Sequence, residues 1–230
     1  MRVMHRVNSL AARAAAVLLL GTAVFGAQAQ TLQDEREQLI DAINEVLQDP
    51  ERKQEAIRAG QDRSLLCASC HGVDGNSVKS DMPNLAEQTP AYLVEQMIHF
   101  ADGTRRNFVM QALTREFSFE DKVNLAVYYT SQPLKPIEYE QARVSRGESL
   151  YMQSCVRCHG ETGRGELGYA RLAGQQIAYV ELTLKRYRAN ANRTGDPEDR
   201  RRSDTSMEQV TASLSDADIS NVAHFIAQMR

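Results

Sequence analysis

The chain has 230 residues, of which 42% are hydrophobic and 25% charged, with no Trp and a formal charge of −3 at pH 7. This composition excludes a wholly disordered chain, and the slight acidity argues against a general nucleic-acid binder. Four cysteines are too few for a small secreted fold that disulfides hold together.

Residues 1–29 have the pattern of a secretory signal peptide. Arg2, Arg6 and Arg13 precede the short apolar run AAAVLLLGTAV, and Ala27-Gln28-Ala29 places small residues at a cleavage site. Cleavage would leave a chain that begins at Gln30, and the loss of three arginines would take its formal charge from −3 to −6. The alternative is an uncleaved anchor, but the run is shorter than the roughly 20 apolar residues of a membrane span. We therefore expect a periplasmic protein.

A helical extension is expected over residues 30–56. Its apolar residues recur at helical spacing: Leu39, Ile40, Ile43, Val46 and Leu47. Asp49-Pro50 is expected to end this first helix. Such a helix could dock a partner or pack on its own chain, and packing on its own chain is the usual outcome.

All four cysteines fall in two identical frames, Cys67-Ala68-Ser69-Cys70-His71 and Cys155-Val156-Arg157-Cys158-His159, each followed by Gly. C-x-x-C-H is the attachment signature of c-type heme. Two thiols on one helical turn add to the two vinyl groups of a heme, and the adjacent His binds the iron. The sequence therefore predicts two covalently bound heme c groups.

Three other interpretations of the cysteines are weaker. A zinc ribbon would not require a His after each pair, and its two knuckles usually lie closer together in the chain. A thioredoxin-like redox pair needs a βαβ setting that this sequence lacks. A disulfide within one frame would form only if heme loading failed.

The chain contains an internal repeat. At an offset of 87, Asn84-Leu85-Ala86-Glu87-Gln88 matches Arg171-Leu172-Ala173-Gly174-Gln175, and Tyr92 matches Tyr179. Beyond a polar insertion of about ten residues in the second copy, the offset becomes 97. We expect two homologous domains, at 57–131 and 143–230, joined by a linker over 132–142 that two prolines stiffen.

The expected secondary structure is helical throughout. Ser118 with Asp121, and Ser215 with Asp218, are matching capping-box signals for the last helix of each domain. Middle helices are expected over 92–101 and 179–189. Basic residues cluster in and just before the insertion, where they could steer an acidic partner or simply form a solvated loop: Arg186, Arg188, Arg193 and Arg200 to Arg202.

The repeat also selects a second iron ligand for each heme. Six methionines remain after residue 29: Met82, Met97, Met110, Met152, Met207 and Met229. Any single Met is more often a packing residue, but only Met110 and Met207 pair with each other, at the offset of 97, and both precede the last capped helix in what reads as a loop. His99 and His224 do not repeat, so they are expected to be structural or solvated.

These features resemble the diheme cytochromes c4 over about residues 57–230. The shared features are the two C-x-x-C-H motifs, the Asn-Leu-Ala or Arg-Leu-Ala segments, the Tyr-led middle helices and the paired Met. The resemblance implies an all-α protein of two tandem class I cytochrome c domains related by pseudo-twofold symmetry. It also implies His–Met axial ligation, His71 with Met110 and His159 with Met207. Glu87 departs from the family pattern, which has Gly there, as at Gly174.

The favoured function is a periplasmic electron carrier between redox protein partners, delivering electrons toward a terminal oxidase, rather than an enzyme. One alternative is the cytochrome subunit of a larger oxidoreductase, such as a flavocytochrome that oxidises sulfide. A diheme enzyme is the third hypothesis, and it would need one iron with an open or labile sixth position. A membrane oxidase and a flavoprotein subunit are thus the candidate partners.

Overall fold

The computed structural model describes residues 30–165, 168–194 and 203–230. Within these ranges every regular element is a helix, which confirms the all-α expectation. The expected signal peptide lies outside the described residues. The helices that follow residue 48 are α2 (Pro50–Ser64), α3 (Ala68–His71), α4 (Pro90–Asp102), α5 (Phe108–Arg115), α6 (Phe119–Thr130), α7 (Gln141–Ser154), α8 (Val156–His159), α9 (Ile177–Ala191), α10 (Thr205–Thr211) and α11 (Asp216–Gln228).

The chain is helical over 30–48, and side chains four residues apart, such as Gln30 and Asp34, bond along the first turns. Residues from Leu39 onward belong to the main compact unit. Leu39 and Ile43 are fully buried in its first apolar core, so this part of the extension packs on its own chain. Asp49 ends the helix and caps α2, which means that the expected domain start at residue 57 falls inside α2.

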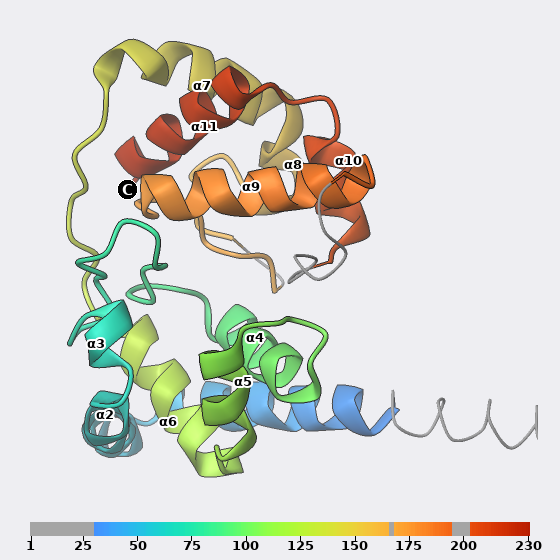
Figure 1. Ribbon diagram of the computed structural model, residues 1–230. Coiled ribbons are helices and arrows are strands. Elements are labelled where there is room, and N and C mark those ends of the chain that lie inside the picture. The colour runs from blue at the N-terminus through green and yellow to red at the C-terminus, as the bar shows by residue number, and fades with distance from the viewer. Residues whose placement is uncertain (1–29, 166–167, 195–202) are drawn as a thin grey trace, which may run out of the picture. The chain divides into compact units, whose positions relative to one another are not determined.

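Within the described residues the same order of helices occurs twice, as α2 to α6 and as α7 to α11 (Figure 1). In the first copy α2 packs on α6, and α4 packs on both α5 and α6. In the second copy α7 packs on α11, and α9 packs on both α10 and α11. Each copy has its own core of buried apolar side chains, one around α2, α4 and α6 and the other around α7, α9 and α11.

The crossing of the first and last helix in each copy depends on a glycine. A Cβ on Gly60 in α2 would lie 2.3 Å from the backbone oxygen of Asn124 in α6. A Cβ on Gly147 in α7 would lie 2.1 Å from the backbone oxygen of Asn221 in α11. The two helices of each pair approach so closely that only glycine fits at the crossing.

The capping predictions are confirmed, and the middle helices are longer than expected. Ser118 and Ser215 each form a complete capping box with the Asp three residues on. The middle helix α4 starts at Pro90 rather than at residue 92, because the Thr89 side chain caps it and proline suits a first helical turn. Its counterpart α9 starts at Ile177 rather than at 179.

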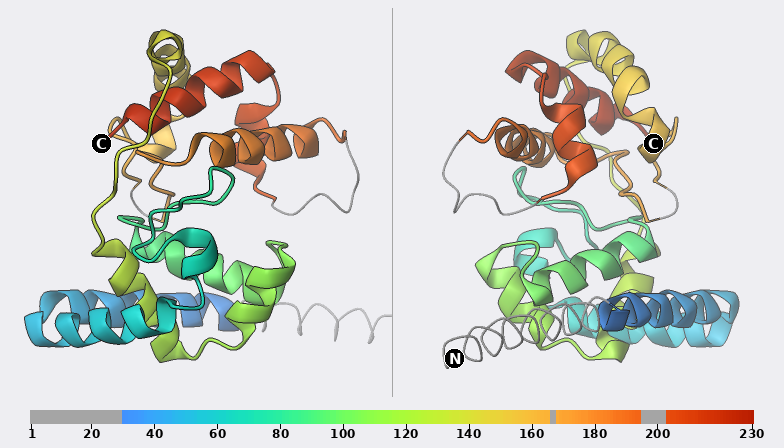
Figure 2. Two further views of the ribbon diagram at one scale, coloured as in Figure 1. Left: turned by 60° about the vertical axis from the view of Figure 1, so that its left-hand side comes forward. Right: turned by 90° about the vertical axis from the view of Figure 1, so that its right-hand side faces the viewer.

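The loop between α3 and α4 contacts the second copy. Figure 2 shows this loop between the helices of the two copies, and its residues Ser77 and Ser80 contact the start of α9. The Tyr179 N–H donates to the Ser80 carbonyl at 2.9 Å, and the Gln176 side-chain amide donates to the Ser77 carbonyl at 2.7 Å. The two copies are therefore joined by hydrogen bonds as well as by the linker.

Candidate functional site

Each cysteine pair occupies one helical turn. Cys67 caps the short helix α3, and the Cys70 and His71 N–H groups donate to its carbonyl at 3.1 and 2.9 Å. The second motif repeats this turn, with 3.2 and 3.0 Å between the equivalent atoms of Cys158, His159 and Cys155. None of the four cysteines forms a disulfide bond. Both sulfurs of a pair are thus available on one turn, with the His directly after them.

The glycine after each motif ends the turn. Gly72 and Gly160 both have φ of +79°, a conformation that favours glycine. A Cβ on Gly72 would also lie 2.1 Å from the Asn76 backbone oxygen. The glycine in each copy therefore lets the chain leave the turn and fold back toward the later segment whose carbonyl holds the histidine.

Both histidines are buried and held by a backbone carbonyl. The Nδ1 atom of His71 lies 3.0 Å from the Pro83 oxygen, and that of His159 lies 2.9 Å from the Ala170 oxygen. A carbonyl only accepts hydrogen bonds, so Nδ1 carries the proton and Nε2 keeps its lone pair. Burial lowers the pKa of His71, which favours this neutral form. Each imidazole is therefore prepared to bind a metal through Nε2.

The donor set fits a covalently attached heme c. Paired thiols on one turn match the two vinyl positions, and a neutral imidazole follows them as an iron ligand. The zinc-ribbon alternative is not supported, because no group of three or more His, Cys, Asp or Glu side chains comes together within the described ranges. Heme c supplies reversible one-electron exchange at its iron.

Met110 and Met207 lie on short helices, not in loops as the sequence suggested. Asn107 caps α5 by accepting the Met110 N–H at 3.0 Å, and Asp204 caps α10 by accepting the Met207 N–H at 2.9 Å. These caps start a helix just before each Met, which explains the difference from the expected loop.

The two methionine segments also end alike. The hydroxyl of buried Thr114 donates to the Met110 carbonyl, and that of Thr211 donates to the Met207 carbonyl, both at 2.8 Å. The caps and threonines repeat at the same offset of 97 as the methionines, so the sequence itself contains this signal.

Three of the other candidate side chains differ in their surroundings. Met97 is buried in the first core and Met152 is 45% exposed. His224 is buried in α11, where its Nδ1 accepts the Glu140 N–H at 2.9 Å and so supports the start of α7. It is a structural residue, as expected for a histidine that does not repeat.

Of the basic residues considered as a steering patch, Arg188 is bound to its own domain. Arg188 donates to the Leu214 carbonyl at 2.6 Å and pairs with Asp216, so it ties α9 to the start of α11. Arg200 to Arg202 lie outside the described residues.

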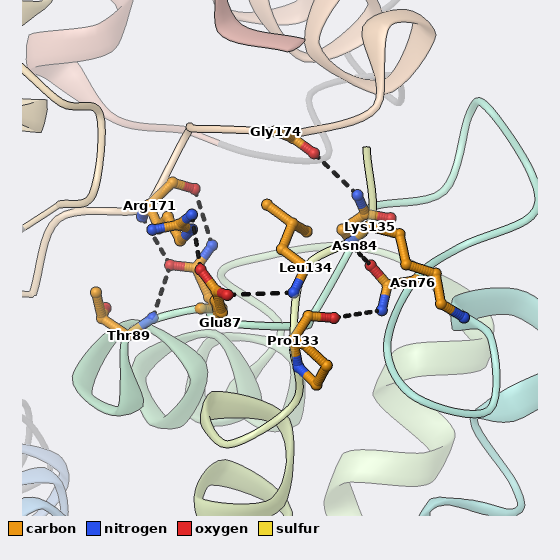
Figure 3. Close-up of polar contacts among 10 residues, drawn as sticks. Asn76, Asn84, Glu87, Thr89, Pro133, Leu134, Lys135, Arg171 and Gly174 are labelled. Atoms are coloured by element: carbon orange, nitrogen blue, oxygen red, sulfur yellow. Dashed lines mark hydrogen bonds and ion pairs between the residues drawn. The ribbon is translucent and has the colours of Figure 1, made fainter. Parts of the chain in front are cut away.

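The repeated Asn84–Gln88 and Arg171–Gln175 segments meet each other, which sequence reasoning did not anticipate. The Gln88 side chain brackets the Arg171 backbone, with 2.7 Å from the Arg171 N–H and 3.0 Å to its carbonyl. Gln175 brackets Asn84 in the same way, at 2.7 and 3.1 Å. Figure 3 shows the neighbouring contacts of Asn84 and Arg171. The offset of 87 relates Gln88 to Gln175 and Asn84 to Arg171. Each glutamine therefore binds, in the other copy, the counterpart of the residue four positions before itself, which is the reciprocity of a twofold interface.

Two homologous helical domains, each with a heme-attachment turn and a neutral imidazole, define a diheme c-type cytochrome. A family model for cytochrome c matches residues 144–230. The chain is 34% identical over 179 residues to cytochrome c4 of Pseudomonas aeruginosa, covering 73% of this chain and 86% of that protein. It is 32% identical over 185 residues to a thiosulfate dehydrogenase electron acceptor of Thiomonas intermedia, covering 74% and 81%.

The structure of reduced cytochrome c4 from Pseudomonas stutzeri superimposes with a TM-score of 0.65 at 30% identity, covering 75% of this chain and 98% of that one. This chain therefore belongs to the cytochrome c4 family. It is a diheme electron-transfer protein with two covalently bound heme c groups, not an enzyme.

Proposed function

We propose that the protein is an exported electron carrier in which each iron is held by one His and one Met. The ligands are His71 with Met110 and His159 with Met207. A thioether in the sixth position closes the iron to small molecules and raises its potential, which suits a carrier rather than a catalyst.

One observation supports this assignment above the others. Met110 and Met207 occupy the same position of equivalent helices, each between a capping side chain that accepts its N–H and a buried threonine that donates to its carbonyl. A packing Met needs no such fixed backbone, because its flexible side chain adapts to gaps. A ligand Met gains from it, because the sulfur must reach one point.

Carbon monoxide tests the assignment. It should leave the visible spectrum of the reduced wild-type protein unchanged, because both irons are six-coordinate. Met110→Leu should open one iron, so about half of the heme signal should shift. Met97→Leu is the matched control, since the second copy has Leu184 at that position. A wild-type protein that binds carbon monoxide would contradict the carrier proposal.

The partners are redox proteins. We propose that the carrier delivers electrons toward a terminal oxidase. The Thiomonas intermedia relative is named as an electron acceptor of thiosulfate dehydrogenase. This supports a second candidate role, in which the chain takes electrons from an enzyme that oxidises a small sulfur compound. That role is related to the alternative of a cytochrome subunit in a larger oxidoreductase, such as a flavocytochrome that oxidises sulfide.

Two reactions distinguish the donor from the acceptor. Oxidised protein mixed with a thiosulfate dehydrogenase and thiosulfate should develop the bands of the reduced heme, and should not do so without the dehydrogenase. Reduced protein added to membranes that contain a terminal oxidase should be reoxidised by oxygen. Failure of the first reaction removes the sulfur-compound role, and failure of the second removes the oxidase role.

Export and domain limits complete the proposal. Within the described ranges no helix is long and apolar enough to cross a bilayer. Cleavage after Ala29 would yield a periplasmic protein whose intact mass equals that of residues 30–230 plus two hemes. The domains are proposed as 57–131 and 143–230 with the linker at 132–142, and limited proteolysis should cut first in the linker.

A further inference from the structure

Glu87 occupies a backbone position that its counterpart fills with glycine. Its φ is +54°, and that of Gly174 is +68°. The N–H groups of both residues make equivalent bonds to the last helix of their own copy, Glu87 to Tyr129 at 3.0 Å and Gly174 to Ile226 at 2.9 Å. A residue with a Cβ is strained in this conformation, so a glutamate here needs a compensating interaction.

The carboxylate provides that interaction (Figure 3). One Glu87 oxygen lies 2.8 Å from the Arg171 guanidinium, whose side chain is only 7% exposed. The other accepts the Leu134 N–H at 3.2 Å. Glu87 thus joins its own domain, the linker and the second domain at one point.

The counterparts of Glu87 and Arg171 also contact each other, but without charge and with the two copies exchanged. The offset of 87 relates Arg171 to Asn84 and Glu87 to Gly174. In that second contact the Asn84 side-chain amide donates to the Gly174 carbonyl at 3.0 Å. One half of a nearly symmetric interface therefore carries an ion pair between a buried arginine and a partly exposed glutamate, and the other half carries a neutral hydrogen bond.

The ion pair lies one residue away from an iron-site carbonyl. Ala170, whose oxygen holds the His159 ring, directly precedes Arg171. Gln88 fixes the Arg171 backbone and Glu87 fixes its side chain, and both come from the first domain. Groups that orient a ligating His also tune the metal that it binds.

We propose that Glu87 is a positioning residue for the iron site of the second domain. It acts through Arg171, whose neighbour Ala170 holds His159, and so makes the second site electrostatically and mechanically different from the first. The inference rests on the proposed binding of iron by His159. It concerns the difference between the two sites, whereas the carbon monoxide experiment tests the carrier itself.

The test is a redox titration of the full, heme-loaded protein. Glu87→Gln keeps the shape but removes the charge that neutralises Arg171, so reduction of the nearby iron becomes easier. The equilibrium constant for reduction of one heme should rise about threefold, which raises its midpoint potential by about 28 mV at 59 mV per tenfold change. The midpoint potential of the other heme should not change. Asp81→Asn, which removes an exposed charge from the same loop, should shift neither.

A double-mutant cycle separates positioning from a direct charge effect. If Glu87 acts through Arg171, the Glu87→Gln shift should vanish in an Arg171→Gln background. A shift that persists there, that equals the effect of Asp81→Asn, or that moves both potentials together would overturn the proposal.

The histidine itself gives a second measurement. In the reduced, isotope-labelled protein, hydrogen exchange of the His159 Nδ1 proton should be faster in Glu87→Gln than in wild type, while that of His71 should not change. Glu87→Gly, which makes the position like Gly174, should give the same result without backbone strain. Equal exchange at His159 in all three proteins would overturn the positioning role.

Discussion

The substitution Gly60→Ala tests the helix crossing that organises the first domain. A new Cβ would lie 2.3 Å from the Asn124 oxygen and 2.6 Å from the Tyr128 Cβ. Ordinary contacts between such atoms are about 3.5–4.0 Å, so α2 and α6 would have to separate by roughly 1 Å. Neither contacted atom can rotate away, because one is a backbone atom and the other a Cβ.

Two opposing terms set the size of the effect. Overpacking of this kind costs about 1–3 kcal/mol, and the rigid neighbours place this site at the upper end. Alanine is favoured over glycine inside a helix by about 1 kcal/mol. We therefore expect a net loss of about 2 kcal/mol, which for a domain of this size lowers Tm by roughly 8–16 °C.

Thermal unfolding followed by circular dichroism is the assay. Gly147→Ala should have a similar effect through α7 and α11, because its Cβ would lie 2.1 Å from the Asn221 oxygen. Gln61→Ala, at an exposed neighbouring position of α2, is the control and should change stability by less than about 0.5 kcal/mol. If Gly60→Ala is as stable as the control or more stable, helix propensity dominates and the close crossing is not the reason for glycine.

Three further outcomes are expected. Asn107→Ala removes the cap of the helix that carries Met110, which should cost about 1 kcal/mol in denaturant unfolding and should make part of the heme accessible to carbon monoxide. Gln88→Ala leaves a buried N–H and carbonyl of Arg171 without partners, so the denaturant midpoint should fall by the equivalent of about 2–4 kcal/mol, whereas an interface that tolerates the loss would leave it unchanged. Hydrogen bonds from the side chain and backbone N–H of Ser215 hold the pKa of Asp218 below its usual value. The stability that the Asp218 carboxylate contributes to the fold is therefore present above about pH 4 and is lost as pH falls through the lower, folded-state pKa. The Tm gap between wild type and Asp218→Asn should accordingly narrow in acid, and a gap independent of pH would contradict this reasoning.

Features that depend on a few consecutive residues could be predicted from the sequence. The Cys67 and Cys155 motifs, the capping boxes at Ser118 and Ser215, and the matched pair Met110 and Met207 are each defined within about four residues or by a fixed offset. Heme attachment and helix capping are local chemistry, so spacing alone indicates them. The repeat then predicted two copies of one helical fold.

The tertiary structure decided which residues 83 to 91 positions apart contact each other. The repeated segments already matched in the sequence, but only their folded positions show that Gln88 and Gln175 each hold the other domain's backbone. Likewise, Glu87 read as a simple departure from Gly, whereas its positive φ and its bond to Arg171 make it part of the interface. Comparing the two copies of the repeat shows which residues differ between them. Where a side chain points across the interface depends on how both domains pack. The local sequence thus determined where each heme attaches, and the tertiary structure determined which side chains of one domain contact the other.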